Sequence, residues 1–212
     1  MDKIKLSAHY RVGLEEKGRK TMQSLDLEAE AGECIYLYGN TGRRQAHFQL
    51  LAGQRRPEDG NVTLGQRQFY TQSGLVSYRR DHIGVLPQNG GLLPEIPMLE
   101  QITLPMKLAG WPKEHRGERL RELTGDSLPL HDLYNRPGRC SQRKQAIAAI
   151  IRAVVMKPQV LLVNGFLDEF EALDAQVLWD TLETLRPPHS VLLYFSGAPA
   201  PDFLPWTQKR ML

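Results

Sequence analysis

Short apolar runs alternate with segments of helical periodicity along this chain, and that alternation restricts its fold more than any other feature. The apolar runs lie at 34–38, 83–88, 160–163 and 191–195. Helical periodicity lies at 45–53, from Met98 onward, at 141–156 and at 173–186. Buried strands that alternate with helices are typical of a parallel sheet covered on both faces. The sequence therefore predicts an α/β domain with a largely parallel sheet, in which 191–195 is the last buried strand.

Composition excludes several classes of protein. The 27 basic and 24 acidic residues nearly balance, with a net charge of +3, and this does not indicate a nucleic-acid partner. Cys34 and Cys140 lie far apart without the spacing of a zinc site or a disulfide framework, so we expect no metal and a reducing compartment. No apolar run approaches 18 residues, so a role at a membrane would need a partner.

A glycine turn follows the apolar run 34–38 and precedes a helical segment, which is the context of a phosphate-binding loop. The turn and helix start comprise Gly39, Asn40, Thr41, Gly42, Arg43, Arg44, Gln45 and Ala46. In the pattern GxxxxGK[ST], position 44 would be glycine, 45 the lysine that reaches phosphate, and 46 the hydroxyl that binds magnesium. The residues present favour a plain strand-to-helix turn. The alternative is that Arg43 and Arg44 replace the lysine, although a guanidinium has a different reach.

Several segments together resemble the ATP-binding cassette (ABC) ATPases, and in style the lipoprotein-release, cell-division and lipid-transport branches. In chain order they are AGECIYLYGNTGRRQA (31–46), LLAGQRRPEDGNVTLGQ (50–66), YRRDHIGVLPQ (78–88), LLPEIPMLEQITLPMKLAG (92–110), IIRAVVMKPQVLLV (150–163) and EALD (171–174). The resemblance implies a P-loop NTPase-like α/β fold with a mixed, mostly parallel sheet and an N-terminal antiparallel β part. It also implies one nucleotide-binding domain over 1–212 with a helical subdomain at 90–145.

The resemblance assigns further positions to the family's motifs. Gln88 corresponds to the Q-loop, Asp174 to the D-loop aspartate, and Tyr10 to a possible adenine contact. The signature motif falls on Cys140, Ser141, Gln142, Arg143 and Lys144. In the family, this motif stands at the N-terminus of a helix, where the backbone amides and the helix dipole face a phosphate. Ser141 remains a plausible helix cap, but side chains at 142 and 143 would fill the space of the phosphate.

Two more catalytic positions depart from the family pattern. Aligned without gaps, the Walker B acids fall on Asn164 and Gly165, and the switch histidine falls on Gly197. An acidic pair does follow at Asp168 and Glu169, but its use requires an insertion in the alignment. Without gaps, those two residues are interpreted as solvated loop charges. In a working family member, one acid holds magnesium and the other polarises the attacking water.

These losses predict a pseudo-ATPase without a bound cofactor, docked as a structural or regulatory subunit on an integral membrane protein. The expected docking residues are Leu92, Leu93, Glu95, Ile96 and Leu99, beside the Q-loop. The expected location is cytoplasmic, peripheral on the cytoplasmic face of the inner membrane. A homodimer, or a heterodimer with a paralogous ATPase, is compatible with this interpretation. The alternatives are a weakly active transporter subunit that uses ATP and Mg²⁺, and a soluble interaction module without a membrane partner.

Overall fold

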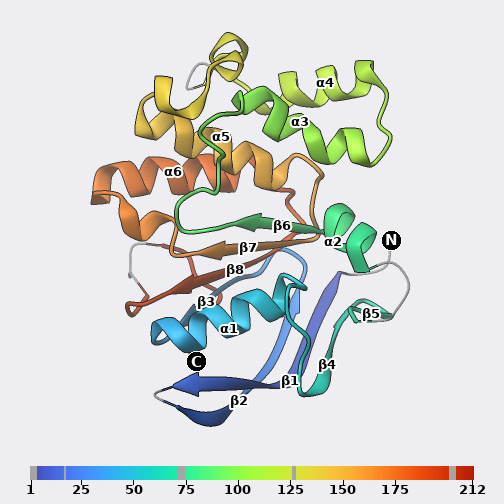
Figure 1. The fold of residues 1–212 in the computed structure, drawn as a ribbon, viewed down its shortest axis with the longest axis vertical. Coiled ribbons are helices and arrows are strands. Elements are labelled where there is room, and N and C mark those ends of the chain that lie inside the picture. Colours follow the sequence, from blue (N-terminus) through green and yellow to red (C-terminus); the bar gives the residue numbers. More distant parts are fainter. Residues whose placement is uncertain (1–3, 17, 71–74, 126–127, 201–203) are drawn as a thin grey trace.

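Two sheets form the framework of the fold in the computed structural model, which describes residues 4–16, 18–70, 75–125, 128–200 and 204–212 (Figure 1). The antiparallel sheet has the order β2-β1-β4-β5. The second sheet has the order β6-β7-β8-β3-β9, and all of its neighbouring strands are parallel. The strands are β1 (Lys5–Glu16), β2 (Arg19–Glu30), β3 (Cys34–Tyr38), β4 (Asp59–Leu64), β5 (Arg67–Gln68), β6 (Ile83–Leu86), β7 (Val160–Asn164), β8 (Val191–Ser196) and β9 (Gln208–Met211).

The helices cover the parallel sheet and form a separate group at one end of the molecule (Figure 1). They are α1 (Thr41–Leu51), α2 (Leu75–His82), α3 (Met98–Leu108), α4 (Lys113–Leu123), α5 (Gln142–Val154) and α6 (Ala172–Leu185), with short 3₁₀ turns η1 (Leu130–Tyr134), η2 (Pro137–Arg139) and η3 (Leu167–Glu169). Helix α1 lies between the two sheets, whereas α5 and α6 cover the other face of the parallel sheet. The predicted α/β fold, with its antiparallel N-terminal part, is confirmed.

Alternating side chains of β3 belong to two hydrophobic cores. Ile35 and Leu37 pack with α1 and the antiparallel sheet, whereas Cys34 and Tyr36 pack on the side of α5 and α6. This alternation follows from the two-residue repeat of a strand, which points successive side chains to opposite faces. The sheet therefore separates the chain into two packed layers. The carboxyl ends of its parallel strands share one edge, which is the usual ligand-binding edge of α/β sheets.

Three elements differ from the sequence-based expectation. Helix α1 begins at Thr41, four positions earlier than the expected 45–53, because Asn40 caps it. Helix α2 was not expected, since its segment was assigned to the approach of the strand that ends near Gln88. Strand β9 follows the predicted last strand and pairs with β3 at the sheet edge, where backbone hydrogen bonds suffice without an apolar run.

Candidate functional site at the carboxyl edge of the parallel sheet

The turn between β3 and α1 is short, and its amides are used by the helix itself. The Gly39 amide donates to the Ser196 carbonyl at 3.1 Å. The Asn40 side chain accepts from the Arg43 amide at 2.9 Å, and the Asn40 carbonyl accepts from the Arg44 amide at 3.0 Å. A phosphate-binding loop leaves such amides free to point at the ligand. Here these two amides point to Asn40 instead.

The Arg44 side chain lies buried at the carboxyl edge of the sheet. Its Nη2 donates to Gln88 Oε1 at 3.4 Å, and its Nη1 lies 4.0 Å from Asp168 Oδ2. Nη1 is also close to Gly165 and Gly197, where an added Cβ would lie only 3.3 and 3.5 Å away. Among the described residues, Nε has no hydrogen-bond partner. A guanidinium therefore fills the space enclosed by these four residues.

The acidic pair borders the same space. Asp168 accepts hydrogen bonds from the Tyr194 hydroxyl at 2.9 Å and from the Ser196 hydroxyl at 2.7 Å. Glu169 accepts a hydrogen bond from the Gln88 side-chain amide. Asp168 is thus held by two hydroxyls, while both Asp168 and Glu169 lie on the exposed surface, as expected for loop charges. Burial, and then the Asp168 charge, raises the pKa of Tyr194.

The other phosphate-loop and Walker B positions point elsewhere. Gln45 is exposed, whereas Ala46 is buried in the core between α1 and the sheets. Asn164 ends β7 in a buried position, and its Oδ1 has no hydrogen-bond partner among the described residues. Of the predicted positions, the structure thus brings Arg44 together with Gln88 and the acidic pair, but leaves 45 and 46 apart.

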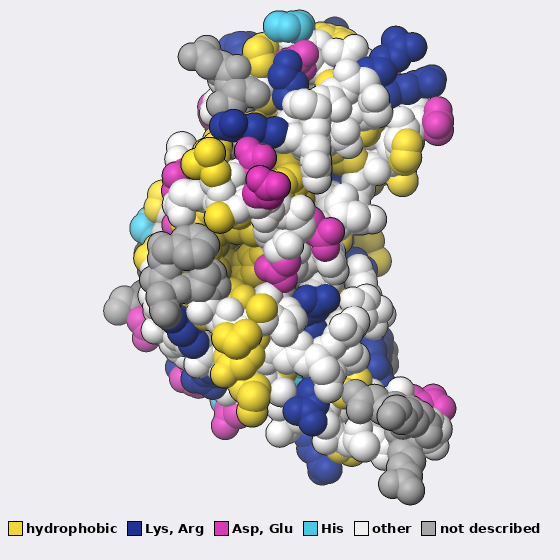
Figure 2. Space-filling view, turned by 90° about the vertical axis from the view of Figure 1, so that its left-hand side faces the viewer, with side chains coloured by type: hydrophobic (Ala, Val, Ile, Leu, Met, Phe, Trp, Pro, Cys, Tyr) yellow, Lys and Arg dark blue, Asp and Glu magenta, His cyan; other side chains and the backbone are white. Residues whose placement is uncertain are grey.

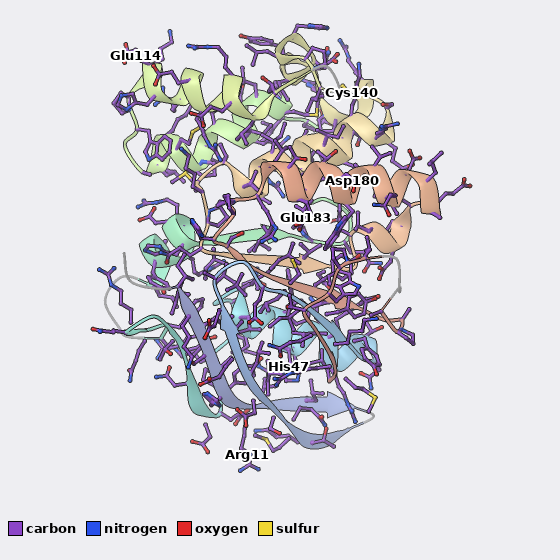
Figure 3. The ribbon with its side chains drawn as sticks, turned by 180° about the vertical axis from the view of Figure 1, so that it is seen from behind. Arg11, His47, Glu114, Cys140, Asp180 and Glu183 are labelled. Atoms are coloured by element: carbon purple, nitrogen blue, oxygen red, sulfur yellow. The ribbon has the colours of Figure 1, made fainter. Side chains whose placement is uncertain are left out.

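Tyr10 lies in the core and not at a nucleotide-facing surface. It is 3% exposed, and its hydroxyl lies 2.9 Å from Nδ1 of His47, which is fully buried on α1 (Figure 3). Burial raises the pKa of Tyr10, whereas burial, followed by the nearby Arg43 charge, lowers the pKa of His47 to about 4. The assignment of Tyr10 as a possible adenine contact is therefore corrected, since a buried ring cannot stack on a base.

The signature segment forms the start of α5. Ser141 caps the helix, and its hydroxyl accepts from the Lys144 amide at 3.3 Å. The Lys144 ammonium pairs with Asp132 at 2.7 Å, and Arg143 lies 3.9 Å from the carboxylate of Asp174, the predicted D-loop residue. The signature and D-loop positions are thus brought together through charged side chains. Glycines at this helix start would instead leave its amides open.

The segment predicted to dock a partner is only partly exposed to solvent. Leu93 and Glu95 are exposed, whereas Leu92, Ile96 and Leu99 are partly buried. The Gln101 side chain fixes this loop, since it donates to the carbonyls of Leu93 and Ile96 and accepts from the Leu93 amide.

A groove of about 370 Å³ lies beside this segment, and the sequence reasoning missed it. Leu104 and Leu108 of α3 line it and are 52% and 66% exposed. Other lining residues are Val85, Pro87 and Met156, with the basic side chains of Arg80 and Arg152. The available signal was a pair of leucines at helical spacing, four positions apart on the solvent side of α3.

The described part of the chain contains neither a metal-binding cluster nor a membrane-spanning helix. No group of three or more His, Cys, Asp or Glu side chains is placed to hold a metal ion there. Within the same ranges, no helix has the length and apolar character needed to cross a bilayer.

Comparison with known proteins identifies the family. The family model described as ABC transporter matches residues 22–169. The lipoprotein-releasing system ATP-binding protein LolD of Geobacter metallireducens is 29% identical over 175 residues, covering 81% of this chain and 78% of its own. The L-cystine transport system ATP-binding protein TcyN of Escherichia coli is 30% identical over 177 residues, covering 80% and 70%.

Solved structures agree with the fold. The dimeric structure of MJ0796, a bacterial ABC transporter cassette, superposes with a TM-score of 0.75 at 19% identity, over 90% of this chain and 87% of that one. A second structure of MJ0796, in a post-hydrolysis state bound to ADP and Pi, superposes with a TM-score of 0.76 at 18% identity. The match over residues 22–169, the curated relatives and the shared architecture agree, and this chain belongs to the ABC transporter family of ATP-binding proteins.

Proposed function

We propose that this chain is an ABC transporter subunit that takes the place of an ATP-hydrolysing subunit without turning over ATP itself. The observation that carries this proposal is the position of Arg44, whose buried guanidinium fills the space between Gln88, Asp168 and Gly165. In an active site of this family, that neighbourhood would receive phosphate oxygens and magnesium. A cationic side chain repels the metal and leaves no volume for the phosphate.

The residues around the β3–α1 turn do not fit a magnesium–triphosphate. The amides of Arg43 and Arg44 are bonded to Asn40, so they cannot cradle phosphate. Gln45 is exposed and carries no charge, and Ala46 has no oxygen to offer the metal. These residues therefore supply neither the phosphate contacts nor the metal ligand that ATP hydrolysis would need.

A partner's nucleotide would also meet an unfavourable surface at the start of α5. Gln142 and Arg143 carry side chains where open backbone amides would be needed, and Arg143 pairs with Asp174. MJ0796 forms a dimer in its solved structures. For this chain we infer that a homodimer, or a heterodimer with a paralogous ATPase, would require contacts other than trapped ATP.

The expected partner is an integral membrane subunit, contacted from the cytoplasmic face of the inner membrane. The groove lined by Leu104 and Leu108, together with the exposed Leu93, offers an apolar surface for a short helix of such a partner. Arg152 also lines this groove, where its guanidinium donates to the Gly90 and Gly91 carbonyls, and its charge favours an acidic residue on that helix.

Nucleotide binding tests the proposal directly. Purified protein is titrated with ATP and Mg²⁺ by calorimetry, and its melting temperature is followed in parallel. A ligand present at about 100 times its Kd stabilises a fold by about 2.7 kcal/mol, which raises the melting temperature of a domain this size by roughly 5–10 °C. We expect no saturable heat and no shift at millimolar nucleotide. Saturable binding would contradict the proposal.

A weakly active ATP-binding subunit is the second candidate, and the relatives favour it, since LolD and TcyN are both named ATP-binding proteins. Its structural support is the acidic pair, because Glu169 accepts a hydrogen bond from Gln88 and Asp168 accepts one from Ser196 at the same edge of the sheet. Hydrolysis that disappears in Glu169→Gln but persists in Glu171→Gln, the exposed neighbour, would establish this candidate.

Partner docking has its own test. Leu104→Asp with Leu108→Asp should release the protein from native membranes, because two charges would enter an apolar groove. Met211→Asp is the matched control, since Met211 is 74% exposed on β9, away from the groove. Membrane association that survives the double substitution would refute docking through this groove. Recovery of the unaltered protein only in cytosolic fractions would favour the soluble interaction module.

A further inference from the structure

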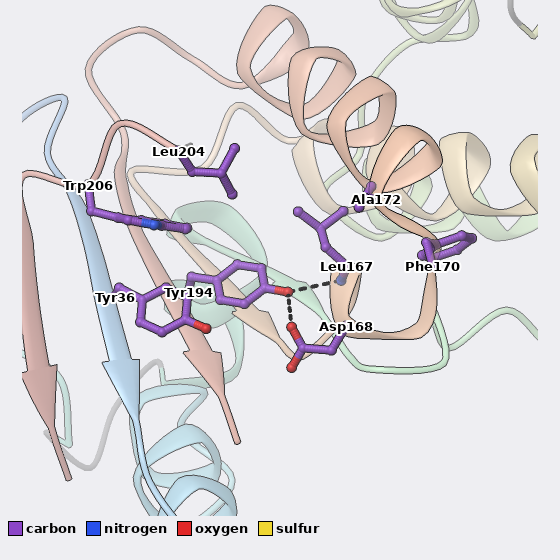
Figure 4. A pocket seen from close by; sticks show the side chains of 9 residues that line it. Tyr36, Leu167, Asp168, Phe170, Ala172, Tyr194, Leu204 and Trp206 are labelled. Carbon is purple, nitrogen blue, oxygen red and sulfur yellow. Dashed lines mark hydrogen bonds between the residues drawn. The ribbon is translucent and has the colours of Figure 1, made fainter. Parts of the chain in front are cut away.

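A pocket of about 250 Å³ opens at the carboxyl edge of the parallel sheet, on the side opposite α1. Its walls come from β3, β8, the η3–α6 segment and the segment that leads into β9 (Figure 4). The face of the molecule shown in Figure 2 carries a hollow of apolar side chains at mid-height, bordered by acidic ones. Arg44 does not line this pocket, but Asp168 borders both the pocket and the arginine-filled space, with its Oδ2 4.0 Å from Arg44 Nη1.

Three aromatic rings form the inner wall. Tyr36 and Tyr194 are stacked, with ring centroids 5.4 Å apart and an angle of 7° between their planes. Trp206 is tilted against them at 4.7 Å from Tyr36 and 5.5 Å from Tyr194. The tyrosine hydroxyls are occupied, since Tyr36 donates to the Ala198 carbonyl and Tyr194 donates to Asp168. The rings therefore offer the pocket their faces and edges rather than free hydroxyls.

One carboxylate stands at the end of this wall. Asp168 is the sole charged side chain among the described residues that line the pocket. Its two oxygens each accept one hydroxyl hydrogen bond, from Tyr194 and Ser196. A carboxylate can accept about four hydrogen bonds, so Asp168 retains acceptor capacity, and its side chain is 34% exposed. Fixed hydroxyls hold this acceptor in place beside the aromatic wall.

We propose that this pocket binds a small organic cation that has a one-ring or similarly sized apolar body. Aromatic faces attract cations, and the carboxylate supplies an acceptor for the cation's N–H groups. The size agrees, because a cavity of about 150 Å³ holds one benzene ring, and about 250 Å³ leaves room for a short aminomethyl substituent. This inference involves neither ATP nor a membrane partner, although it shares Asp168 with the candidate site.

Benzylamine is the probe, and its binding to the whole chain is measured by ligand-observed NMR and calorimetry without nucleotide. Benzyl alcohol and benzoate are neutral and anionic probes of nearly the same shape. We expect saturable benzylamine binding, at least tenfold weaker binding of benzyl alcohol, and none of benzoate. Equal affinity for benzylamine and benzyl alcohol, or no saturable binding of benzylamine, would overturn the proposal without any variant being needed.

Two variants and a control locate the binding. Asp168→Asn and Trp206→Ala should each weaken benzylamine about tenfold, the first through the lost charge and the second through the lost ring face. Asp180→Asn removes an exposed carboxylate from α6 outside the pocket, and its affinity should equal that of the unaltered chain. Circular dichroism confirms that each variant is folded. Unchanged affinity in a folded Asp168→Asn would refute the assignment.

Discussion

His47 is buried in a neutral form beside Tyr10, and this makes the free energy of unfolding depend on pH. The pKa of His47 falls from 6.5 to about 4 on folding. Between these two values, the unfolded chain binds a proton that the folded chain excludes. Stability is therefore fully present above pH 6.5 and decreases as the pH falls toward 4. The slope is about 1.4 kcal/mol per pH unit within this window, which gives a loss of about 2 kcal/mol between about pH 7.5 and pH 5.

The matched perturbation is His47→Gln. The glutamine side-chain amide can still form a hydrogen bond with the Tyr10 hydroxyl, but it does not titrate. Urea unfolding, followed by circular dichroism, gives the free energy of unfolding of both chains at the two pH values. The variant should lose about 2 kcal/mol less than the unaltered chain on acidification. Contributions from other titrating groups, such as the ion-paired Glu28 and Asp81, cancel in this difference.

His115→Gln serves as the control, because it removes a histidine that is exposed on α4. Its pH dependence should match that of the unaltered chain. The reasoning would be refuted if His47→Gln and the unaltered chain lost equal stability between about pH 7.5 and pH 5. That result would mean that His47 takes up a proton in the folded chain as readily as in the unfolded chain.

Further predictions concern α5 and its surroundings, and each is measured by urea unfolding. Ile150→Ala should cost about 2–5 kcal/mol, since Ile150 is fully buried and the cavity cannot collapse completely. Ser141→Ala should cost about 1 kcal/mol through the lost helix cap. Arg119→Met should cost about 2–3 kcal/mol, because two buried carbonyls at the end of α5 lose their donor; a loss below about 0.5 kcal/mol would show that water replaces it.

The order of strands and helices was predictable because it depends on local periodicity. The buried runs of β3, β7 and β8 have no polar residue before their last positions. Each strand can therefore be predicted from a few neighbouring residues. Strand β9 was missed because Gln208–Met211 is half exposed and joins the sheet through backbone pairing with β3. Edge strands of this kind carry little signal in their side chains.

The candidate site was less accessible to sequence reasoning. Asn40 is a preferred cap residue and therefore indicates the early start of α1. The sequence analysis instead aligned this segment with the pattern of a phosphate-binding loop and placed the helix later. The position of Asp168 depends on hydroxyls of Tyr194 and Ser196, more than 25 positions away along the chain. Contacts at that separation arise from the sheet topology, and no local spacing encodes them. The pairing of Arg44 with Gln88 has the same origin.

The early start of α1 limits what substitutions toward the phosphate-binding pattern can achieve. Because the helix already includes position 45, a lysine introduced there would project from the exposed face of α1, away from Gln88 and Asp168. Substitution toward the family pattern, one residue at a time, would therefore leave the loop unformed. Formation of a phosphate-binding loop here would require a longer turn or a later helix start, together with new side chains.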